Sequence, residues 1–166
     1  MVSTGDITIY NFDKQSDPSD WRILDDGVMG GLSQGRFFIN DEGYGIFKGK
    51  VRLENNGGFS SVRFEPHNIQ VTDQTTIKIK LKGDGKKYQF RIRSNPREYH
   101  SYIYNFQTSG VWETIEINLA DMYPSWRGRR LNMDNFSTGP ISEIGFLIGN
   151  KKPESFELQI DNIQLD

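Results

Sequence analysis

The residues best suited to chemistry are two adjacent carboxylates, Asp25 and Asp26, which open a turn at Gly27. Two carboxylates at a tight turn could bind a calcium ion or act as an acid and a base. They are equally typical of a structural turn, because an aspartate beside glycine accepts hydrogen bonds from backbone amides. No D-x-D-x-D-G calcium loop is present, and adjacent residues of a strand point to opposite faces. We therefore favour the structural interpretation, with no metal and no joint catalytic role.

A second set of polar side chains follows one face of the strand predicted at residues 87–94. Gln89, Arg91 and Arg93 alternate there with apolar residues, so the two sets point to opposite faces. A guanidinium left unpaired in a dry core costs several kcal/mol. These arginines must therefore face water, a carboxylate or a ligand.

The strand predicted at residues 101–107 could complete a groove beside these arginines. It offers aromatic side chains, Tyr104 among them, on one face and Asn105 and Gln107 on the other. Aromatic rings beside planar hydrogen-bonding groups suit sugars or peptide side chains. A plain solvated face explains the same pattern, since antiparallel sheets commonly expose one side.

A basic and aromatic cluster, Trp126, Arg127, Arg129 and Arg130, lies in a segment without alternation. It could hold a phosphate, a carboxylate or an acidic partner surface. An arginine packed over Trp126 could instead anchor a long connection. Nucleic acid is not expected, because the chain has 20 basic against 22 acidic residues and a net charge of −2.

Catalytic and metal-binding sets are otherwise lacking in the sequence. There is no cysteine, the two histidines His67 and His100 lie far apart, and Ser60 and Ser61 are not in a G-x-S-x-G motif. We expect no enzyme activity and no cofactor. The enzymatic alternative is a hydrolase that uses either Asp25 or Asp26, with an arginine of the 87–94 strand as an anion clamp.

Apolar residues recur with a period of two along most of the chain, which is typical of strands with one buried face. The 166 residues suit one domain, residues 1–166, folded as an all-β sandwich of two antiparallel sheets. Strands are predicted near residues 7–12, 20–24, 35–40, 44–53, 58–65, 75–82, 87–94, 101–107, 111–118, 141–148 and 155–165.

Three local features qualify this pattern. Gly83-Asp84-Gly85 predicts a hairpin between the strands that end at residue 82 and begin at residue 87. Residues 119–140 predict a long surface connection with a helical turn. A change of parity after Ile160 predicts a bulge near Asp161 and Asn162 that returns the last apolar residues to the core.

Targeting signals are not recognisable in the sequence. Residues 1–6 show neither a basic nor an apolar signal region, and no run approaches the roughly 18 apolar residues that span a bilayer. We expect no membrane span and a cytoplasmic protein.

Two glycine-rich turns are the most distinctive segments. Residues 21–31 read W-R-I-L-D-D-G-V-M-G-G, and residues 53–63 read L-E-N-N-G-G-F-S-S-V-R. With Phe47-x-Gly49-x-Val51, Arg127-Gly128-Arg129 and Ile144-Gly145-Phe146, they resemble the complex I intermediate-associated protein 30 family over nearly the whole chain.

This resemblance implies a galactose-binding-like β-sandwich of the jelly-roll type. It also implies a non-catalytic assembly or scaffolding factor whose partner is a protein, such as an assembly intermediate of a respiratory complex. The alternative is a carbohydrate-binding module that binds sugars on a concave sheet face. The predicted ligand-binding residues are Trp21, Asp25, Asp26, Arg63, Arg91, Arg93, Tyr104, Trp126, Arg127 and Arg129.

Overall fold

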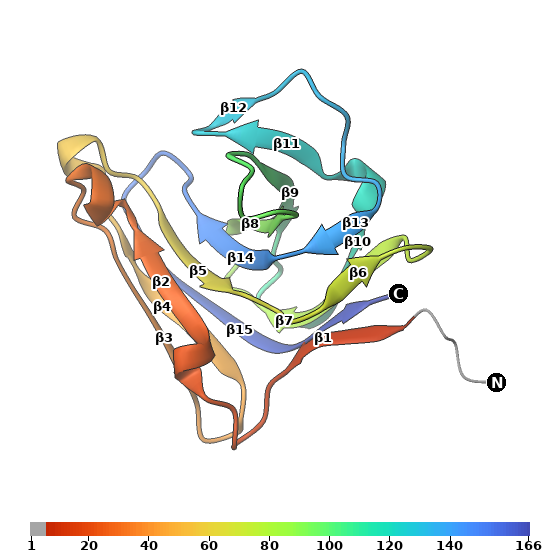
Figure 1. Cartoon of the computed structure of the whole chain (residues 1–166). Coiled ribbons are helices and arrows are strands. Elements are labelled where there is room, and N and C mark those ends of the chain that lie inside the picture. The colour runs from red at the N-terminus through yellow and green to blue at the C-terminus, as the bar shows by residue number, and fades with distance from the viewer. Residues whose placement is uncertain (1–5) are drawn as a thin grey trace.

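The computed structural model describes residues 6–166, apart from the side chains of Val28, Met29 and Asn56. Two antiparallel sheets stack to form a jelly-roll β-sandwich, as predicted (Figure 1). Within the described residues, the helical elements are the short 3-10 turns η1 (Pro18–Asp20), η2 (Asp26–Met29), η3 (Glu54–Asn56) and η4 (Leu119–Asp121). The predicted absence of a targeting segment concerns residues 1–6, of which residues 1–5 lie outside the described part.

The strand order of each sheet brings together segments that are distant in sequence. Sheet A has the order β10 (Trp112–Asn118), β7 (Thr76–Lys82), β15 (Glu154–Leu165), β4 (Gly45–Val51), β3 (Gln34–Ile39), and β1 (Ile7–Asn11) also pairs with β15. Sheet B has the order β12 (Arg129–Arg130), β11 (Tyr123–Trp126), β9 (Ser101–Gln107), β8 (Lys87–Arg93), β14 (Glu143–Ile148), β5 (Ser60–Phe64), β2 (Trp21–Asp25). A small third sheet pairs β13 (Gly139–Ile141) with β6 (Ile69–Val71).

The core lies between sheets A and B and is built by the predicted alternation. Ile77, Ile79 and Leu81 of β7 are fully buried, while the lysines between them point outward. From sheet B, Phe90 and Phe146 pack against each other with ring centroids 5.4 Å apart. Burial of such apolar area is the main contribution to the stability of the fold.

The predicted bulge in β15 is confirmed. The pairing of β15 with β7 shifts register between Ile160 and Asn162. Because of this extra residue, Ile163 and Leu165 return to the core and are fully buried, as Ile160 is.

The predicted hairpin at residues 82–87 is wrong. β7 pairs with β10 and β15 in sheet A, whereas β8 pairs with β9 and β14 in sheet B. The glycines do make a tight connection, but this connection crosses from one sheet to the other. Turn residues alone do not determine whether the strands that they join belong to the same sheet.

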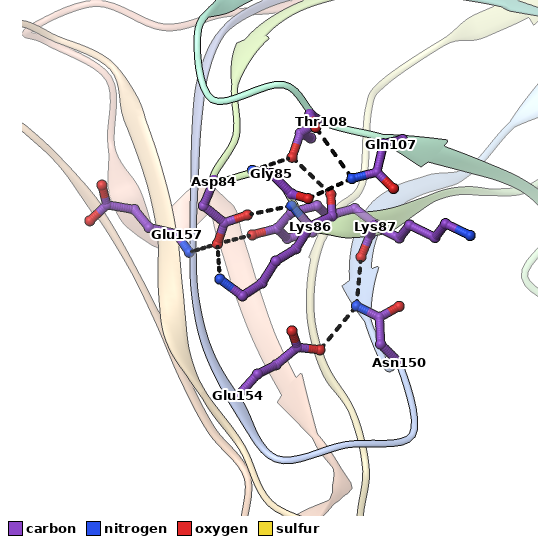
Figure 2. Close-up of polar contacts among 10 residues, drawn as sticks. Asp84, Gly85, Lys86, Lys87, Gln107, Thr108, Asn150, Glu154 and Glu157 are labelled. Carbon is purple, nitrogen blue, oxygen red and sulfur yellow. Dashed lines mark hydrogen bonds and ion pairs between the residues drawn. The ribbon is translucent and has the colours of Figure 1, made fainter.

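The crossing loop is anchored by Asp84, as Figure 2 shows. The Asp84 carboxylate accepts hydrogen bonds from the Glu157 backbone N–H of β15 at 2.8 Å and from the Tyr88 hydroxyl at 3.0 Å. Behind it, the Thr108 hydroxyl accepts from Gly85 N at 3.0 Å and donates to the Lys86 carbonyl at 2.8 Å. The loop therefore ties β15 of sheet A to β8 and to the end of β9 in sheet B.

The predicted long connection at residues 119–140 contains more structure than expected. It holds the helical turn η4, as predicted, but also β11, β12 and the start of β13. These strands are short and β11 contains Pro124, so period-two alternation gave no signal there. Among residues 6–166, none of the helical elements has the length and apolar character that a membrane crossing needs.

Candidate functional site

One row of residues runs across sheet B on the side away from the core. The strand registers place each residue directly opposite the next on a neighbouring strand: Arg22, Arg63, Gly145, Arg91, Ile103 and Tyr123. In the adjacent row, Glu143 of β14 lies opposite Arg93 of β8. We call this surface the arginine face: Arg22, Arg63, Arg91, Arg93, Ser101, Ile103, Asn105, Tyr123, Arg130, Glu143, Gly145 and Leu147.

The arginine face is hollow at its centre. Figure 1 shows that sheet B curves, with β11 and β12 at one end and β5 and β2 at the other. Ile103 and Leu147 lie on this outer side but are only 3% and 9% exposed. Side chains in the middle of a flat outer face would be exposed to solvent, so this burial indicates concavity.

Gly145 creates a small pocket in this hollow. Because it has no side chain, a gap remains between Arg63 on one neighbouring strand and Arg91 on the other. A Cβ at Gly145 would lie 2.8 Å from the Val62 carbonyl oxygen, so even alanine would not fit without a shift. The pocket has a volume of about 10 Å³, room for about one water molecule. Its polar lining comes from Ser61, Arg63, Arg91, Arg93, Ser101 and Glu143.

Glu143 is shared between two arginines of the face. Its carboxylate lies 3.5 Å from Arg63 Nη1 and 3.8 Å from Arg22 Nη2. Arg22 also lies 3.9 Å from Glu65 at the exposed edge. Burial lowers the pKa of Arg63, Glu143 opposes this shift, and the charges of Arg93 and Arg22 add to it.

Arg91 has a different environment. Among the described residues, no carboxylate lies within 4.0 Å of its guanidinium, and its side-chain hydrogen bond goes to the neutral Gln89 Oε1 at 3.1 Å. Burial, together with the charges of Arg63 and Arg93, lowers the pKa of Arg91 to about 10. The group therefore remains cationic at neutral pH, and burial leaves that charge poorly solvated.

The next arginine along β8 is also incompletely satisfied. The buried Nε of Arg93 has no hydrogen-bond partner among the described residues. Arg93 lies opposite Glu143 in the register, but that carboxylate is held by Arg63 and Arg22. The β8 side of the pocket thus has an excess of positive charge.

The rim of the arginine face is formed by β9, β11 and β12. The Asn105 amide donates to the Tyr123 hydroxyl at 2.8 Å, and Arg130 lies over the Tyr123 ring with its Cζ 4.8 Å from the ring centroid. Sequence reasoning missed Tyr123 and Glu143 as site residues. Strand alternation could have assigned Glu143 to a face, but only the register of β14 between β8 and β5 places it in the pocket.

The structure brings Arg63, Arg91 and Arg93 together but separates Tyr104 from them. Tyr104 lies opposite Phe90, on the core side of sheet B. Arg91 lies opposite Ile103, and Ile103 and Asn105 point to the same side of β9. Asn105 therefore shares the face with the arginines. Of the two faces considered for β9, the amide-bearing one is therefore beside the arginines.

Trp21 is a core residue. It is 4% exposed, and its ring lies 5.2 to 5.6 Å from the ring centroids of Tyr10, Phe12, Phe37 and Phe64. This aromatic cluster fills the end of the sandwich under β1 and β2. A ligand has no access to the Trp21 ring.

Asp26 joins the two glycine-rich turns. Its buried carboxylate accepts from the backbone N–H of Ser33 at 3.0 Å, Gly58 at 2.7 Å and Phe59 at 3.2 Å, and from the Ser33 hydroxyl. Burial opposes ionisation, but these hydrogen bonds outweigh it and hold the pKa of Asp26 below its usual value. A carboxylate with this many internal partners is committed to structure.

Asp25 has its own separate role in the fold. It accepts from Gly35 N of β3 at 2.8 Å and from the Ser60 hydroxyl of β5. It thus links strands of the two sheets at the edge of the sandwich. The structural interpretation of the Asp25-Asp26 pair explains these contacts, and neither residue lines the pocket between the arginines.

The cluster at residues 126–130 forms the tip of the β11–β12 hairpin. Trp126 is 43% exposed and lies beside the exposed Tyr99 ring. The Arg127 guanidinium lies over the Trp126 ring, with its Cζ 4.9 Å from the ring centroid. Arg129 pairs with Trp126 in the hairpin register. Ser125 lies opposite Ser101 and so belongs to the same side of sheet B as the arginine face. The next residue, Trp126, points to the other side, and its ring therefore lies outside the pocket. Its packing fits the anchoring alternative.

Within the described residues, no group of three histidine, aspartate or glutamate side chains is placed to hold a metal ion. At the β15 bulge, the Asp161 carboxylate forms an ion pair with Lys80 at 3.5 Å.

Comparison with known sequences identifies the family. The sequence profile described as Complex I intermediate-associated protein 30 matches residues 10–160. The chain belongs to the complex I intermediate-associated protein 30 family. No curated protein sequence matches it.

Several solved structures resemble the fold of this family member. A family 11 carbohydrate-binding module from Clostridium thermocellum, in complex with a β-1,3-1,4-mixed-linked tetrasaccharide, is 16% identical with a TM-score of 0.71, covering 99% of this chain and 96% of that one. A family 29 carbohydrate-binding module is 10% identical with a TM-score of 0.58, over 97% and 91% of the chains. An agarase is 15% identical with a TM-score of 0.61, over 98% of this chain but 24% of the agarase. At these identities the likeness shows the fold alone.

Proposed function

We propose that this member of the complex I intermediate-associated protein 30 family is a non-catalytic binding module that holds a protein partner through its arginine face. The observation that supports this most directly is the partly buried, incompletely paired Arg91 at the bottom of a hollow surface. A surface of this kind is completed by a ligand group. The family name favours a protein, such as an assembly intermediate of a respiratory complex, as the partner.

The arrangement of carboxylates supports binding over catalysis. Asp25 and Asp26 have internal hydrogen-bond partners, and Glu143 is held by Arg22 and Arg63. General acid–base catalysis on a glycosidic bond needs two carboxylates that face a common substrate. The hydrolase alternative, which placed Asp25 or Asp26 beside Arg91 or Arg93, is thus unsupported by their positions.

Site-specific photo-crosslinking in the native host tests this proposal. A crosslinking amino acid replaces Asn105, an exposed residue on the rim of the arginine face, and in a matched variant it replaces Thr114, an exposed residue of β10 in sheet A. We expect a defined protein adduct from position 105 and none from position 114. No adduct from either position, or the same adducts from both, would contradict the proposed function.

Carbohydrate binding is the second candidate, and the rim of the face favours it. The Tyr123 ring, the Asn105 amide and the Arg130 guanidinium lie together there. An aromatic ring beside planar hydrogen-bonding groups suits a sugar. Calorimetric titration with neutral and acidic oligosaccharides tests this candidate. An oligosaccharide that binds wild type but not Tyr123→Ala would support carbohydrate binding. The absence of a heat of binding with every oligosaccharide would contradict it.

A further inference from the structure

We infer that the pocket between Arg63, Arg91 and Arg93 is a carboxylate-binding site, and that its ligand is an aspartate or glutamate side chain in an acidic segment of the partner protein. This inference rests on the proposed function, because it names the chemical group by which that partner is held. Charge, desolvation and size support it separately.

The charges in the pocket do not balance. Arg63, Arg91 and Arg93 line it, and Glu143 is the carboxylate among its lining residues. Glu143 is also shared with Arg22. Three cations and one anion leave an excess of two positive charges in a partly buried space. A further negative group would therefore be attracted to the pocket.

The unmet charge is on the β8 side. Arg63 contacts Glu143 at 3.5 Å, whereas Arg91 has the neutral Gln89 as its partner. A buried cation without a counter-charge is unfavourable, and a hydrogen-bonded anion relieves that cost. Guanidinium groups bind carboxylates through two parallel N–H···O bonds, so an arginine suits this group in geometry as well as charge.

The size of the pocket limits which anion fits. A volume of about 10 Å³ has room for about one water-sized group, so a single ligand oxygen can enter. A pyranose ring is too large to enter. A carboxylate on a flexible side chain can place one oxygen in the pocket and keep the other at its mouth, within reach of the arginines.

The surroundings suit a polypeptide that lies across the hollow. Arg22 lies on one side of the pocket and Tyr123, with Arg130 over its ring, lies on the other. These side chains could contact residues that flank the bound carboxylate, with the arginines favouring further acidic residues. Charge complementarity therefore commits the surface to an acidic peptide segment.

The test uses the full chain and four probes at about 20 mM salt, where exposed charges are little screened. The probes are a capped Gly-Glu-Glu-Gly peptide, its glutamine counterpart, its phosphoserine counterpart and trigalacturonate. Binding is followed by NMR through the backbone amide of Gly145 and the side-chain Nε–H of Arg91. We expect the glutamate peptide to shift both signals and the glutamine peptide to shift neither.

Two variants of equal charge change locate the site. Arg91→Met should weaken binding of the glutamate peptide about tenfold, which corresponds to about 1.4 kcal/mol. Arg36→Met removes one positive charge from exposed β3 of sheet A and should change the affinity by less than about twofold. Arg91→Lys keeps the charge without the planar fork and should give an intermediate loss, which keeps the test valid if the methionine variant folds poorly.

Several outcomes would overturn the inference. The glutamine peptide could bind as tightly as the glutamate peptide, or Arg36→Met could weaken binding as much as Arg91→Met does. The phosphopeptide or trigalacturonate could also bind more tightly than the glutamate peptide. Its failure is distinguishable from failure of the proposed function. A protein adduct from position 105 without glutamate-peptide binding leaves the binding function and removes the carboxylate assignment, whereas peptide binding without any protein adduct does the reverse.

Discussion

Asp26 is a single buried carboxylate that holds two loops from different parts of the chain. It accepts from Ser33 in one turn region and from Gly58 and Phe59 in the other. The residue spacing suggested an ordinary turn, in which the aspartate bonds its neighbours. The contact across 32 positions to Gly58 could not be predicted, because it depends on β2 lying beside β5 in sheet B.

Replacing Asp26 with asparagine should lower the free energy of unfolding by about 3 kcal/mol, since an amide cannot accept all of these hydrogen bonds and leaves buried donors unpaired. The change should appear in urea unfolding followed by circular dichroism. Asp41→Asn, at an exposed position, is the control and should have little effect. An unfolding midpoint of Asp26→Asn equal to that of wild type would contradict the assigned role.

The pKa of Asp26 also predicts a pH dependence. Its native pKa lies below the usual carboxyl value, so the unfolded state takes up a proton first as the pH falls. The stabilisation is therefore fully present above about pH 4 and is lost as the pH falls through the native pKa. In Asp26→Asn, urea midpoints measured between about pH 5 and pH 2 should fall less steeply than in wild type.

At the scale of elements, local patterns predicted the strands but not their neighbours. The bulge in β15 could be predicted because its change of parity lies within one strand. The alternation of β8 likewise indicated that Arg91 and Arg93 share a face. The assignment of β7 and β8 to different sheets, and the position of β14 between β8 and β5, depend on long-range pairing. The expected hairpin, the place of Tyr104 and the role of Glu143 depended on that missing information.

The glycines of the first glycine-rich turn, residues 21–31, lead to a prediction about the packing of that turn against Asp26. A Cβ at Gly31 would lie 2.4 Å from the Asp26 carboxylate, whereas a Cβ at Gly27 would meet nothing within 4 Å. Gly31→Ala should therefore destabilise the fold by about 2 kcal/mol, and Gly27→Ala should stay within about 0.5 kcal/mol of wild type. Thermal unfolding of both variants tests this, and equal midpoints would show that close approach to Asp26 is unimportant.

The crossing loop between β7 and β8, drawn in Figure 2, leads to another prediction about stability. Asp84→Ala removes the acceptor for Glu157 N and for the Tyr88 hydroxyl, and should cost about 2 kcal/mol. Hydrogen exchange at the Glu157 amide should become faster. Lys86→Met, which loses the 3.5 Å ion pair with Asp84, should change stability by less than about 0.5 kcal/mol. Unchanged protection of Glu157 in Asp84→Ala would argue against the anchor.

At the scale of the whole molecule, charge is nearly balanced but unevenly distributed. The net charge is −2, yet four of the five arginines of the arginine face, Arg22, Arg63, Arg91 and Arg93, lie around Glu143. Overall composition could exclude a strongly basic protein, but it could not reveal this local excess. The excess exists because sheet B brings β2, β5 and β8 to one surface.

This distribution predicts how binding depends on salt. Raising the salt concentration from about 20 mM to about 300 mM should weaken binding of the glutamate peptide about fivefold, because the Debye length falls. In Arg91→Met the affinity for the glutamate peptide should depend less on salt than in wild type, because the positive charge at the bottom of the pocket is gone. Calorimetric titrations at the two salt concentrations measure both effects. An affinity independent of salt would contradict an ionic contact in the pocket.

Recognition at the hollow, arginine-lined side of sheet B is the central claim, and the affinity of the protein crosslinked from position 105 tests it most directly. That protein should bind wild type and Arg36→Met with affinities within about twofold of each other, and Arg91→Met about tenfold more weakly. Equal affinity for all three forms, with Arg91→Met folded as wild type is, would contradict the claim.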